Sequence, residues 1–319
     1  DRIVVGAKRL ATVKDDEDRH NYAYVFYGDT FFETSKDPKW SGMGHEMIAF
    51  THYYIVENGE SFYLHAGESV PIEDFEVPRV RHNFKETSDD KAAWNSLMNA
   101  IAEGISSGEM TKVVSSREVE FTSETPYNVA SILANLVDNN PNCFIFGYEK
   151  DGRTFVGASP EILVRHRGSE ILSYALAGTF PKTMENAGQK LLTDPKNLLE
   201  HDIVVQKIKR NLLEKAEIVK VGTTELMELK NVYHLRTILS AKNSELSLIE
   251  WTKQLHPTPA LGGEPRHEAL EFLRKHENHE RGLYAAPLGL IDSKGNGTMI
   301  VGIRSALIVD KKLYAYVGC

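Results

Sequence analysis

The sequence predicts a single domain of the α+β class with large antiparallel sheets. Strand-like segments follow one another with a few helical segments between them, without the regular alternation of strand and helix that a doubly wound sheet requires. Several of these segments are joined by short turns, which make the two strands antiparallel neighbours. The 319 residues contain no internal repeat and no linker rich in Pro, Gly or Ser, so we expect one domain over residues 1–319.

Composition narrows the classes of function. The chain is 41% hydrophobic, which is enough for a large core, and its net charge of -8 argues against a nucleic-acid or anionic-membrane partner. No apolar run approaches the roughly 18 residues of a membrane span. Two cysteines, Cys143 and Cys319, argue against a disulfide framework and favour the reducing cytoplasm. No exposed apolar helix is evident, so a monomer is expected.

The first 85 residues are rich in predicted strands, including "NYAYVFYG" and a hairpin with its turn at Asn58-Gly59. A helix is expected after Ser88, because apolar residues recur there at intervals of three and four. From Thr111 to Phe121 apolar and polar residues alternate as in one half-buried strand, with Lys112 near its entrance.

The same sequence patterns predict the helices and strands in the middle and at the end of the chain. A helix is expected to open at Pro126, and a long one to run from Pro195 to Ala216. Two more helices are expected in "SLIEWTKQL" and "EPRHEALEFLRKH". The remaining strands are expected in "NCFIFGYE", "RTFVGAS", "EILVRH", "ILSYALAG", "VYHLRTILSA", "LYAAPLGLID", "TMIVGIRSALIV" and "LYAYVGC".

Polar residues interrupt these apolar strands at places where a packed core would not favour them. Glu161 follows a buried-looking strand in "GASPE", and Gly178 and Thr179 end a strand in "LAGT", where bare backbone amides could face an anion. Arg304 stands two residues from Gly302, whose missing side chain would leave space for a flat carboxylate.

Each candidate also has an ordinary structural reading. Lys112 could be a solvated strand end, Glu161 a turn carboxylate and Glu200 part of a solvated helix face. His234, which shares a strand face with Val232, could be a core histidine whose ring nitrogens are hydrogen-bonded within the protein. A second group of polar residues, His276 and His279 in "HENHE", has a spacing that could suggest a metal site, but no third ligand accompanies them and they lie among charges.

Taken together the motifs carry more weight than any one of them. "TKVVSSRE", "VGASPE", "LAGT", "EHDIVV", "VYHL", "HPTPALGGEP", "GLYAAPLGLID" and "VGIRSAL" occur in the order and spacing of one family. From Gly44 to Cys319 the sequence resembles the chorismate-utilising enzymes, which include anthranilate synthase component I, aminodeoxychorismate synthase, salicylate synthase and isochorismate synthase. The resemblance implies two large antiparallel sheets packed face to face with helices outside, and a catalytic core over residues 86–319.

The resemblance also implies a site for chorismate and a magnesium ion. Glu200 would be a magnesium ligand. Arg304 and the backbone at Gly318 would hold the enolpyruvyl carboxylate. The second anion site would be lined by Gly178 and Thr179, with His234 and Tyr284 nearby.

Two further positions would perform the reaction. In family branches that add water, lysine occupies the position of Lys112, and a lysine kept neutral by burial could remove a proton from water as it attacks C2. Glu161 would protonate the departing C4 hydroxyl. This division of roles requires a neutral amine and a protonated carboxyl at the same pH.

Three residues indicate which branch of the chorismate-utilising family the sequence resembles most. Ala177 stands where aminodeoxychorismate synthases typically carry a lysine nucleophile, and Ala260 followed by Leu261 is similar to isochorismate synthases rather than to salicylate synthases. We therefore expect an isochorismate synthase, with a slight preference for the menaquinone over the siderophore pathway. The alternatives are a salicylate synthase and, in a different class, a non-catalytic chorismate-binding protein.

The chain departs from the family pattern in two places. Phe180-Pro181-Lys182 replaces the Arg-Pro-Arg of many relatives. Relatives also continue beyond the segment "YVGC" into a strand and a helix with further magnesium-ligand glutamates and a substrate-binding lysine. The resemblance therefore implies that the sequence omits a C-terminal segment.

Overall fold

The structure, a computed structural model, describes residues 24–57, 60–65, 67–70, 76–88, 90–242 and 245–318. Its larger sheet has nine strands, all in antiparallel pairs. In spatial order they are β12 (Val219–Val221), β14 (Val232–Lys242), β11 (Glu170–Pro181), β10 (Ile162–Arg167), β17 (Gly297–Val301), β16 (Pro287–Asp292), β1 (Tyr24–Gly28) and β2 (Glu46–Ala49), with β13 (Glu225–Glu228) paired to β14.

The second large sheet has six strands. Its order is β5 (Lys85–Glu86), β7 (Ser116–Thr122), β19 (Lys312–Gly318), β18 (Ser305–Val309), β9 (Arg153–Ser159) and β8 (Phe144–Lys150). Two small antiparallel sheets join β6 (Lys112–Val113) to β15 (Gly263–Glu264) and β3 (His52–Glu57) to β4 (Glu60–His65). The turn predicted at Asn58-Gly59 lies outside the described residues, as does Cys319.

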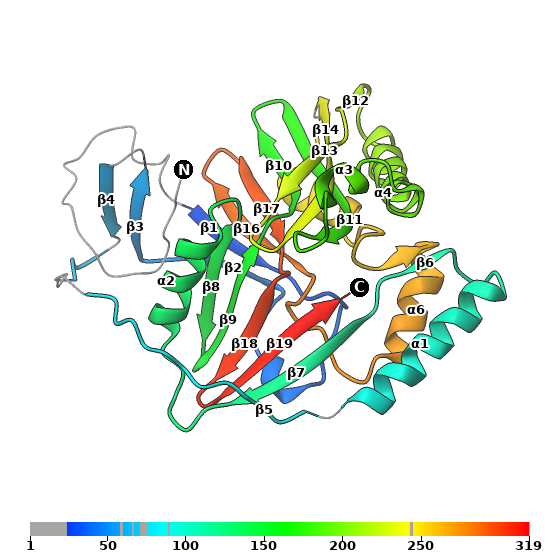
Figure 1. Cartoon of the computed structure of the whole chain (residues 1–319). Coiled ribbons are helices and arrows are strands. Elements are labelled where there is room, and N and C mark those ends of the chain that lie inside the picture. The colour runs from blue at the N-terminus through cyan, green and yellow to red at the C-terminus, as the bar shows by residue number, and fades with distance from the viewer. Residues whose placement is uncertain are drawn as a thin grey trace.

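Helices lie on the outside of these sheets (Figure 1). They are α1 (Lys91–Ser106), α2 (Val129–Asn139), α3 (Ala187–Leu191), α4 (Pro195–Leu213), α5 (Leu248–Leu255) and α6 (Arg266–His276), with a short 3-10 turn η2 (Pro38–Trp40). α4 packs on β11 and β14, α2 on β8 and β9, and α6 on β6 and β15. In the described part of the chain, no helix is long and apolar enough to cross a membrane.

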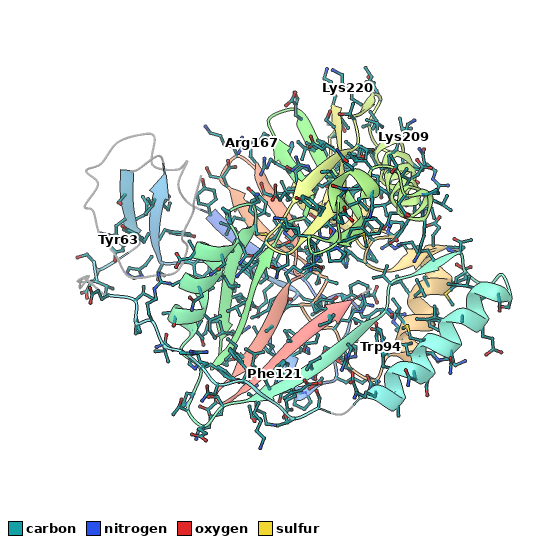
Figure 2. All side chains as sticks on the ribbon, viewed as in Figure 1. Tyr63, Trp94, Phe121, Arg167, Lys209 and Lys220 are labelled. Atoms are coloured by element: carbon teal, nitrogen blue, oxygen red, sulfur yellow. The ribbon has the colours of Figure 1, made fainter. Side chains whose placement is uncertain are left out.

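The main core lies between the two large sheets. Fully buried side chains from both meet there, including Phe155 of β9, Leu163 of β10 and Leu307 of β18. Side chains fill this space in Figure 2, whereas Arg167 and Lys220 point outward. The expected α+β class and its two packed antiparallel sheets are confirmed.

The α4 helix, which carries Glu200, is specified by its own sequence. Asp194 caps its first turn by accepting a hydrogen bond from the amide of Asn197 at 2.8 Å, and Pro195 follows as the first helical residue. The face formed by Val204, Ile208 and Leu212 is buried. The helix ends at Leu213 rather than at Ala216.

Two segments predicted as single strands each turn out to be two strands in different sheets. The segment Thr111–Phe121 divides into β6, in a two-stranded sheet, and β7, in the six-stranded sheet. "TMIVGIRSALIV" likewise divides into β17 and β18, with Arg304 at a positive φ of 54° in the gap. The alternation of apolar and polar residues can continue across such a crossing, where the chain leaves one sheet and enters another. The sequence pattern therefore does not reveal the crossing.

Three smaller corrections concern element boundaries and one unexpected helix. The helix predicted from Pro126 begins at Val129, because the side chain of Asn128 caps it through the amide of Ser131. The strand predicted to end at Gly178 continues to Pro181, with a bulge at Gly178 that accommodates the extra residue. The α3 helix was not predicted.

Replacing Gly289 by alanine is expected to destabilise the protein strongly. Gly289 lies in β16 opposite Met299, and a Cβ there would stand 2.0 Å from the carbonyl oxygen of Thr298. Because both groups are backbone in the sheet, we expect a loss of about 2–4 kcal/mol in the free energy of unfolding, measured by urea denaturation.

The control for this variant is Gly295→Asn in the turn between β16 and β17. Gly295 has a φ of 80° and no atom within 4 Å of an added Cβ, and asparagine tolerates this backbone conformation. Similar losses in the two variants would contradict the assignment of the Gly289 effect to close backbone packing.

Candidate active site

Lys112 and Glu200 meet in space although 88 residues separate them. Lys112 opens β6, and its Nζ lies 2.5 Å from Oε1 of Glu200 on α4. The Lys112 side chain is 11% exposed and that of Glu200 is 38% exposed. The contact gives Lys112 a carboxylate partner that was not predicted from the sequence. Lys112 is thus not a solvated strand end.

A second set of charges holds the same strand pair to the same helix. Glu264 of β15 lies directly opposite Lys112 in the ladder. Its Oε1 lies 3.9 Å from Nζ of Lys207 and 3.6 Å from Nη2 of Arg210, both on α4. The β6–β15 pair therefore presents one cation and one anion to complementary charges along α4.

Glu161 lies between β9 and β10 and is 2% exposed. Its Oε1 is buried and has no hydrogen-bond partner. Burial raises the pKa of Glu161 to about 8, an effect that the positive charge of Arg304 partly offsets. The carboxyl is therefore mostly protonated at neutral pH, the state required of a proton donor.

Thr179, His234 and Arg304 form a hydrogen-bonded series across the larger sheet and into the crossing between the two sheets. Oγ1 of Thr179 lies 2.7 Å from Nδ1 of His234, and Nη2 of Arg304 lies 2.9 Å from Nε2 of the same ring. Burial, reinforced by the charge of Arg304, lowers the pKa of His234 to about 4. The ring is therefore neutral and accepts a hydrogen bond from the guanidinium at Nε2.

The backbone amide of Thr179 in "LAGT" is not bare as expected. The amide of Thr179 donates to Oδ1 of Asn197 at 3.0 Å. Gly178 has a φ of 81°, and a Cβ there would come within 3.2 Å of the Asn197 carbonyl oxygen. The bulge thus lets β11 approach α4, and Asn197 stands one turn before Glu200 on that helix. This contact joins the Lys112–Glu200 pair to the Thr179–His234–Arg304 series.

The expected space beside Gly302 is also absent. A Cβ on Gly302 would stand 2.5 Å from the carbonyl oxygen of Leu283, so backbone fills that side. Arg304 is instead exposed, because its positive φ turns it out of both sheets toward His234. It remains available to a carboxylate, but for a different reason from the one predicted.

The other residues predicted for the site are Tyr284, Gly318, Ala260 and Leu261, and they lie in other segments of the chain. Tyr284 is 6% exposed and stacks on Tyr316 with ring centroids 5.1 Å apart. A Cβ on Gly318 would stand 2.3 Å from the Tyr284 hydroxyl oxygen, so a larger residue in β19 would require the Tyr284 side chain to shift. Ala260 is half-buried and Leu261 buried in the loop before β15.

His201, next to Glu200, is buried and has two partners. Its Nδ1 lies 3.1 Å from the carbonyl oxygen of Ala177, which must accept, so this nitrogen carries the proton. Its Nε2 accepts from the hydroxyl of Thr237 at 2.7 Å. Burial lowers the pKa of His201, in agreement with a neutral ring. The buried ring sets the rotation of α4 and so directs Glu200 outward to Lys112.

The segment "HENHERG" contains the residues that the sequence argument missed. Glu277 and Arg281 form an ion pair whose side chains are 2% and 1% exposed. The two histidines weighed as metal ligands have other neighbours: the ring of His276 stacks on Phe272, and Nε2 of His279 lies 3.0 Å from Oγ of Ser116. A signal was available, because two opposite charges at a spacing of four precede the buried segment at Leu283.

Two cavities lie away from Lys112 and Glu161. The larger, about 650 Å³, is lined by residues between Thr30 and Glu46. The smaller, about 190 Å³, is lined in part by Cys143 and Lys182. Neither contains the predicted catalytic pair.

The sequence profile of the family described as "Chorismate binding enzyme" matches residues 68–319. The chain belongs to this family. Isochorismate synthase MenF of Bacillus subtilis (strain 168) is 38% identical over 237 residues, 72% of this chain and 50% of that protein. The salicylate biosynthesis isochorismate synthase of Pseudomonas aeruginosa is 34% identical over 243 residues, 73% of this chain and 50% of that protein. The chain spans about half the length of these relatives.

Solved structures of the chorismate-binding family share the fold. The menaquinone-specific isochorismate synthase MenF from Escherichia coli superposes with a TM-score of 0.78 and 23% identity, covering 95% of this chain and 74% of that one. Anthranilate synthase component I from Streptococcus pneumoniae TIGR4 gives 0.72 and 19%, covering 86% of this chain and 68% of that one.

Magnesium, which the family resemblance implies, requires oxygen ligands. Glu200 supplies a half-exposed carboxylate, and a magnesium ion can be held by one or two carboxylates with water and substrate oxygens. Among the residues that the structure describes, no group of three His, Cys, Asp or Glu side chains could hold a metal ion. The described residues therefore fit a magnesium ion anchored by one carboxylate, and not an ion enclosed by protein ligands.

Replacing Glu161 by glutamine is expected to change how stability depends on pH. Between pH 4.5 and about 8, the folded protein keeps a proton on Glu161 that the unfolded chain has lost. Stability from this group therefore falls by up to about 1.4 kcal/mol per pH unit as the pH rises through that range. Urea denaturation should show Glu161→Gln close to the wild type at pH 5 and clearly more stable than it at pH 8.

The matched control is Glu170→Gln, at an exposed position at the start of β11. It should follow the wild type at every pH. The assignment fails if Glu161→Gln also parallels the wild type.

Proposed function

We propose that this protein is an isochorismate synthase that converts chorismate to isochorismate by adding a hydroxyl at C2 and removing one from C4. The observation that carries the proposal is the buried Glu161 carboxyl, whose Oε1 has no hydrogen-bond partner and whose pKa burial raises to about 8, in a chain that shares 38% and 34% identity with proteins named isochorismate synthase. A protonated carboxyl can give a proton to a leaving hydroxyl at neutral pH, which a carboxylate cannot do.

Arg304 would bind a carboxylate of the substrate. Its guanidinium is exposed, and neutral His234 holds one of its donors at 2.9 Å, which leaves other donors for a bidentate contact. Because Thr179 holds the other side of the imidazole, the orientation of Arg304 is set before substrate arrives.

The reaction would consume one water and release another. Lys112 removes a proton from the attacking water as its oxygen bonds to C2, both ring double bonds move by one position (C1=C2 to C1=C6 and C5=C6 to C4=C5), and the C4–O bond breaks. Glu161 gives its proton to the departing oxygen, so water leaves and the product is an isomer of the substrate. Solvent then returns the proton from Lys112 to Glu161. Lys112 can accept a proton only as a neutral amine, so it must first lose its proton and leave Glu200.

We propose magnesium as the cofactor, with Glu200 as one ligand. When bound, the ion would supply positive charge to the ring carboxylate of chorismate. Glu200 pairs with Lys112 in this structure. Lys112 and magnesium would therefore bind the Glu200 carboxylate alternately. The support for this proposal is the resemblance together with the half-exposed carboxylate.

We further propose a cytoplasmic, monomeric protein that acts on a small molecule. The support for the compartment is the sequence, whose two cysteines argue against a disulfide framework. Relatives with names of both the menaquinone and the siderophore type match this chain, and the proposed chemistry is common to both.

Product analysis of the full-length protein with chorismate and magnesium tests the proposed activity. Isochorismate should form, and Lys112→Ala and Glu161→Gln should each lower kcat by about 10²–10⁴. Lys312→Ala is the control, since Lys312 also opens a strand and pairs with a glutamate, Glu120, on the surface. Salicylate with pyruvate would indicate a salicylate synthase, and binding of chorismate without turnover would indicate a non-catalytic protein.

Replacing Glu200 by glutamine is expected to weaken magnesium binding roughly tenfold or more, because a charged oxygen ligand is lost. Isothermal titration of the full-length protein with magnesium alone, without chorismate, measures this without turnover. Asp202→Asn, at an exposed position on the same helix, should bind magnesium as the wild type does. Unchanged magnesium affinity in Glu200→Gln would remove Glu200 from the ligand set.

A further inference from the structure

Arg281 and Glu277 form a bidentate pair at the base of the candidate site. Nε of Arg281 donates to Oε2 of Glu277 at 2.8 Å, and Nη2 donates to Oε1 at 2.7 Å. Both side chains are almost fully buried. The Phe31 ring covers the guanidinium, with its centroid 4.2 Å from Cζ, and the Tyr284 ring lies 5.9 Å away.

The guanidinium also holds two backbone carbonyls. Nη2 donates to the carbonyl oxygen of Val114 at 2.7 Å, and Nη1 donates to that of Leu261 at 2.8 Å. Val114 directly follows β6, and Leu261 lies two residues before β15. Within the described residues β6 pairs only with β15. Arg281 therefore contacts the ends of both strands in the two-stranded sheet that carries Lys112.

Glu277 secures the next segment along the chain. Its Oε1 accepts from the amide of Ser116 at 2.7 Å and from the Ser116 hydroxyl at 2.9 Å. Ser116 is the first residue of β7, in the six-stranded sheet. The pair therefore holds the chain on both sides of Ser115, where it passes from the Lys112 strand into a different sheet.

Stability alone does not require a buried ion pair. Two charges removed from water lose their hydration, and well-packed apolar side chains of similar volume often serve as well or better. A guanidinium, however, can hold a carboxylate and two separate carbonyls in a fixed geometry, which no apolar side chain can do.

We propose that Arg281 and Glu277 are positioning residues that set the place of Lys112, an inference that rests on the proposed function. β6 has two residues, and few ladder hydrogen bonds hold it: Thr111 N to Glu264 O at 2.9 Å and Val114 N to Gly262 O at 2.8 Å flank it. A displacement of about 1 Å in a reacting group can cost roughly 100-fold in rate. The buried pair supplies the rigidity that this short strand lacks.

The test begins with Arg281→Lys in the full-length protein. Lysine keeps the charge near Glu277, but one ammonium cannot reach both Val114 O and Leu261 O from that position. We expect kcat to fall about 10- to 100-fold while KM for chorismate stays within a few fold. The control is Arg274→Lys in the exposed Glu271–Arg274 pair of α6, which should leave kcat unchanged.

Two further variants separate positioning from loss of folding. The double variant Arg281→Met, Glu277→Leu leaves no uncompensated buried charge, so it should resist urea better than Arg281→Met alone and yet show the same fall in kcat. In a Lys112→Ala background, Arg281→Lys should have no further effect, because it acts through a side chain that is no longer there. An equal loss in both backgrounds, or wild-type kcat in Arg281→Lys, would overturn the inference.

A readout without turnover distinguishes failure of this inference from failure of the proposed function. Hydrogen exchange of the amides of Thr111 and Val114 should accelerate in Arg281→Lys at least about tenfold, while amides of β19 keep their protection. If the wild type does not convert chorismate, the proposed function fails, and exchange still decides whether Arg281 holds β6. Unchanged exchange at both amides would show that it does not.

Discussion

An ionisable group removed from water must either be paired or become neutral, and this constraint shapes the candidate site. Arg281 and Glu277 meet it as a pair, with almost no exposure of either side chain. Burial favours the neutral form of two other groups: it raises the pKa of Glu161 and lowers the pKa of His234. Lys112 meets it through Glu200. The same desolvation that costs stability thus favours a protonated carboxyl at Glu161, a neutral ring at His234 and a paired cation at Lys112.

The candidate site occupies the places where the chain changes sheets. β6 gives way to β7 around Ser115, and β17 gives way to β18 around Ile303. At these crossings backbone groups lack ladder partners, so side chains and loops must satisfy them. Arg281 does so at the first crossing and reaches Val114 O. At the second, Arg304 has a positive φ and an exposed side chain.

α4 connects the two halves of the site. Asn197 accepts a hydrogen bond from Thr179 of β11, and Glu200, one turn later, holds Lys112. Buried His201 sets the rotation of the helix through Ala177 and Thr237. α4 therefore links the Thr179–His234–Arg304 series to Lys112, although these residues come from distant parts of the sequence.

By itself the sequence determined the fold class, the principal helices and the family, because hydrophobic periodicity, caps and collinear motifs are local properties. Glu161 and Lys112 were also found as polar interruptions of apolar strands, and their catalytic roles stay predictions. Only the tertiary structure decided which strands belong to which sheet, that Glu200 pairs with Lys112, and that the Thr179 amide is occupied. It also brought Arg281 to Val114 and Leu261. The physical reason is that partners of buried charges are chosen by proximity in space, which alternation along the chain does not encode.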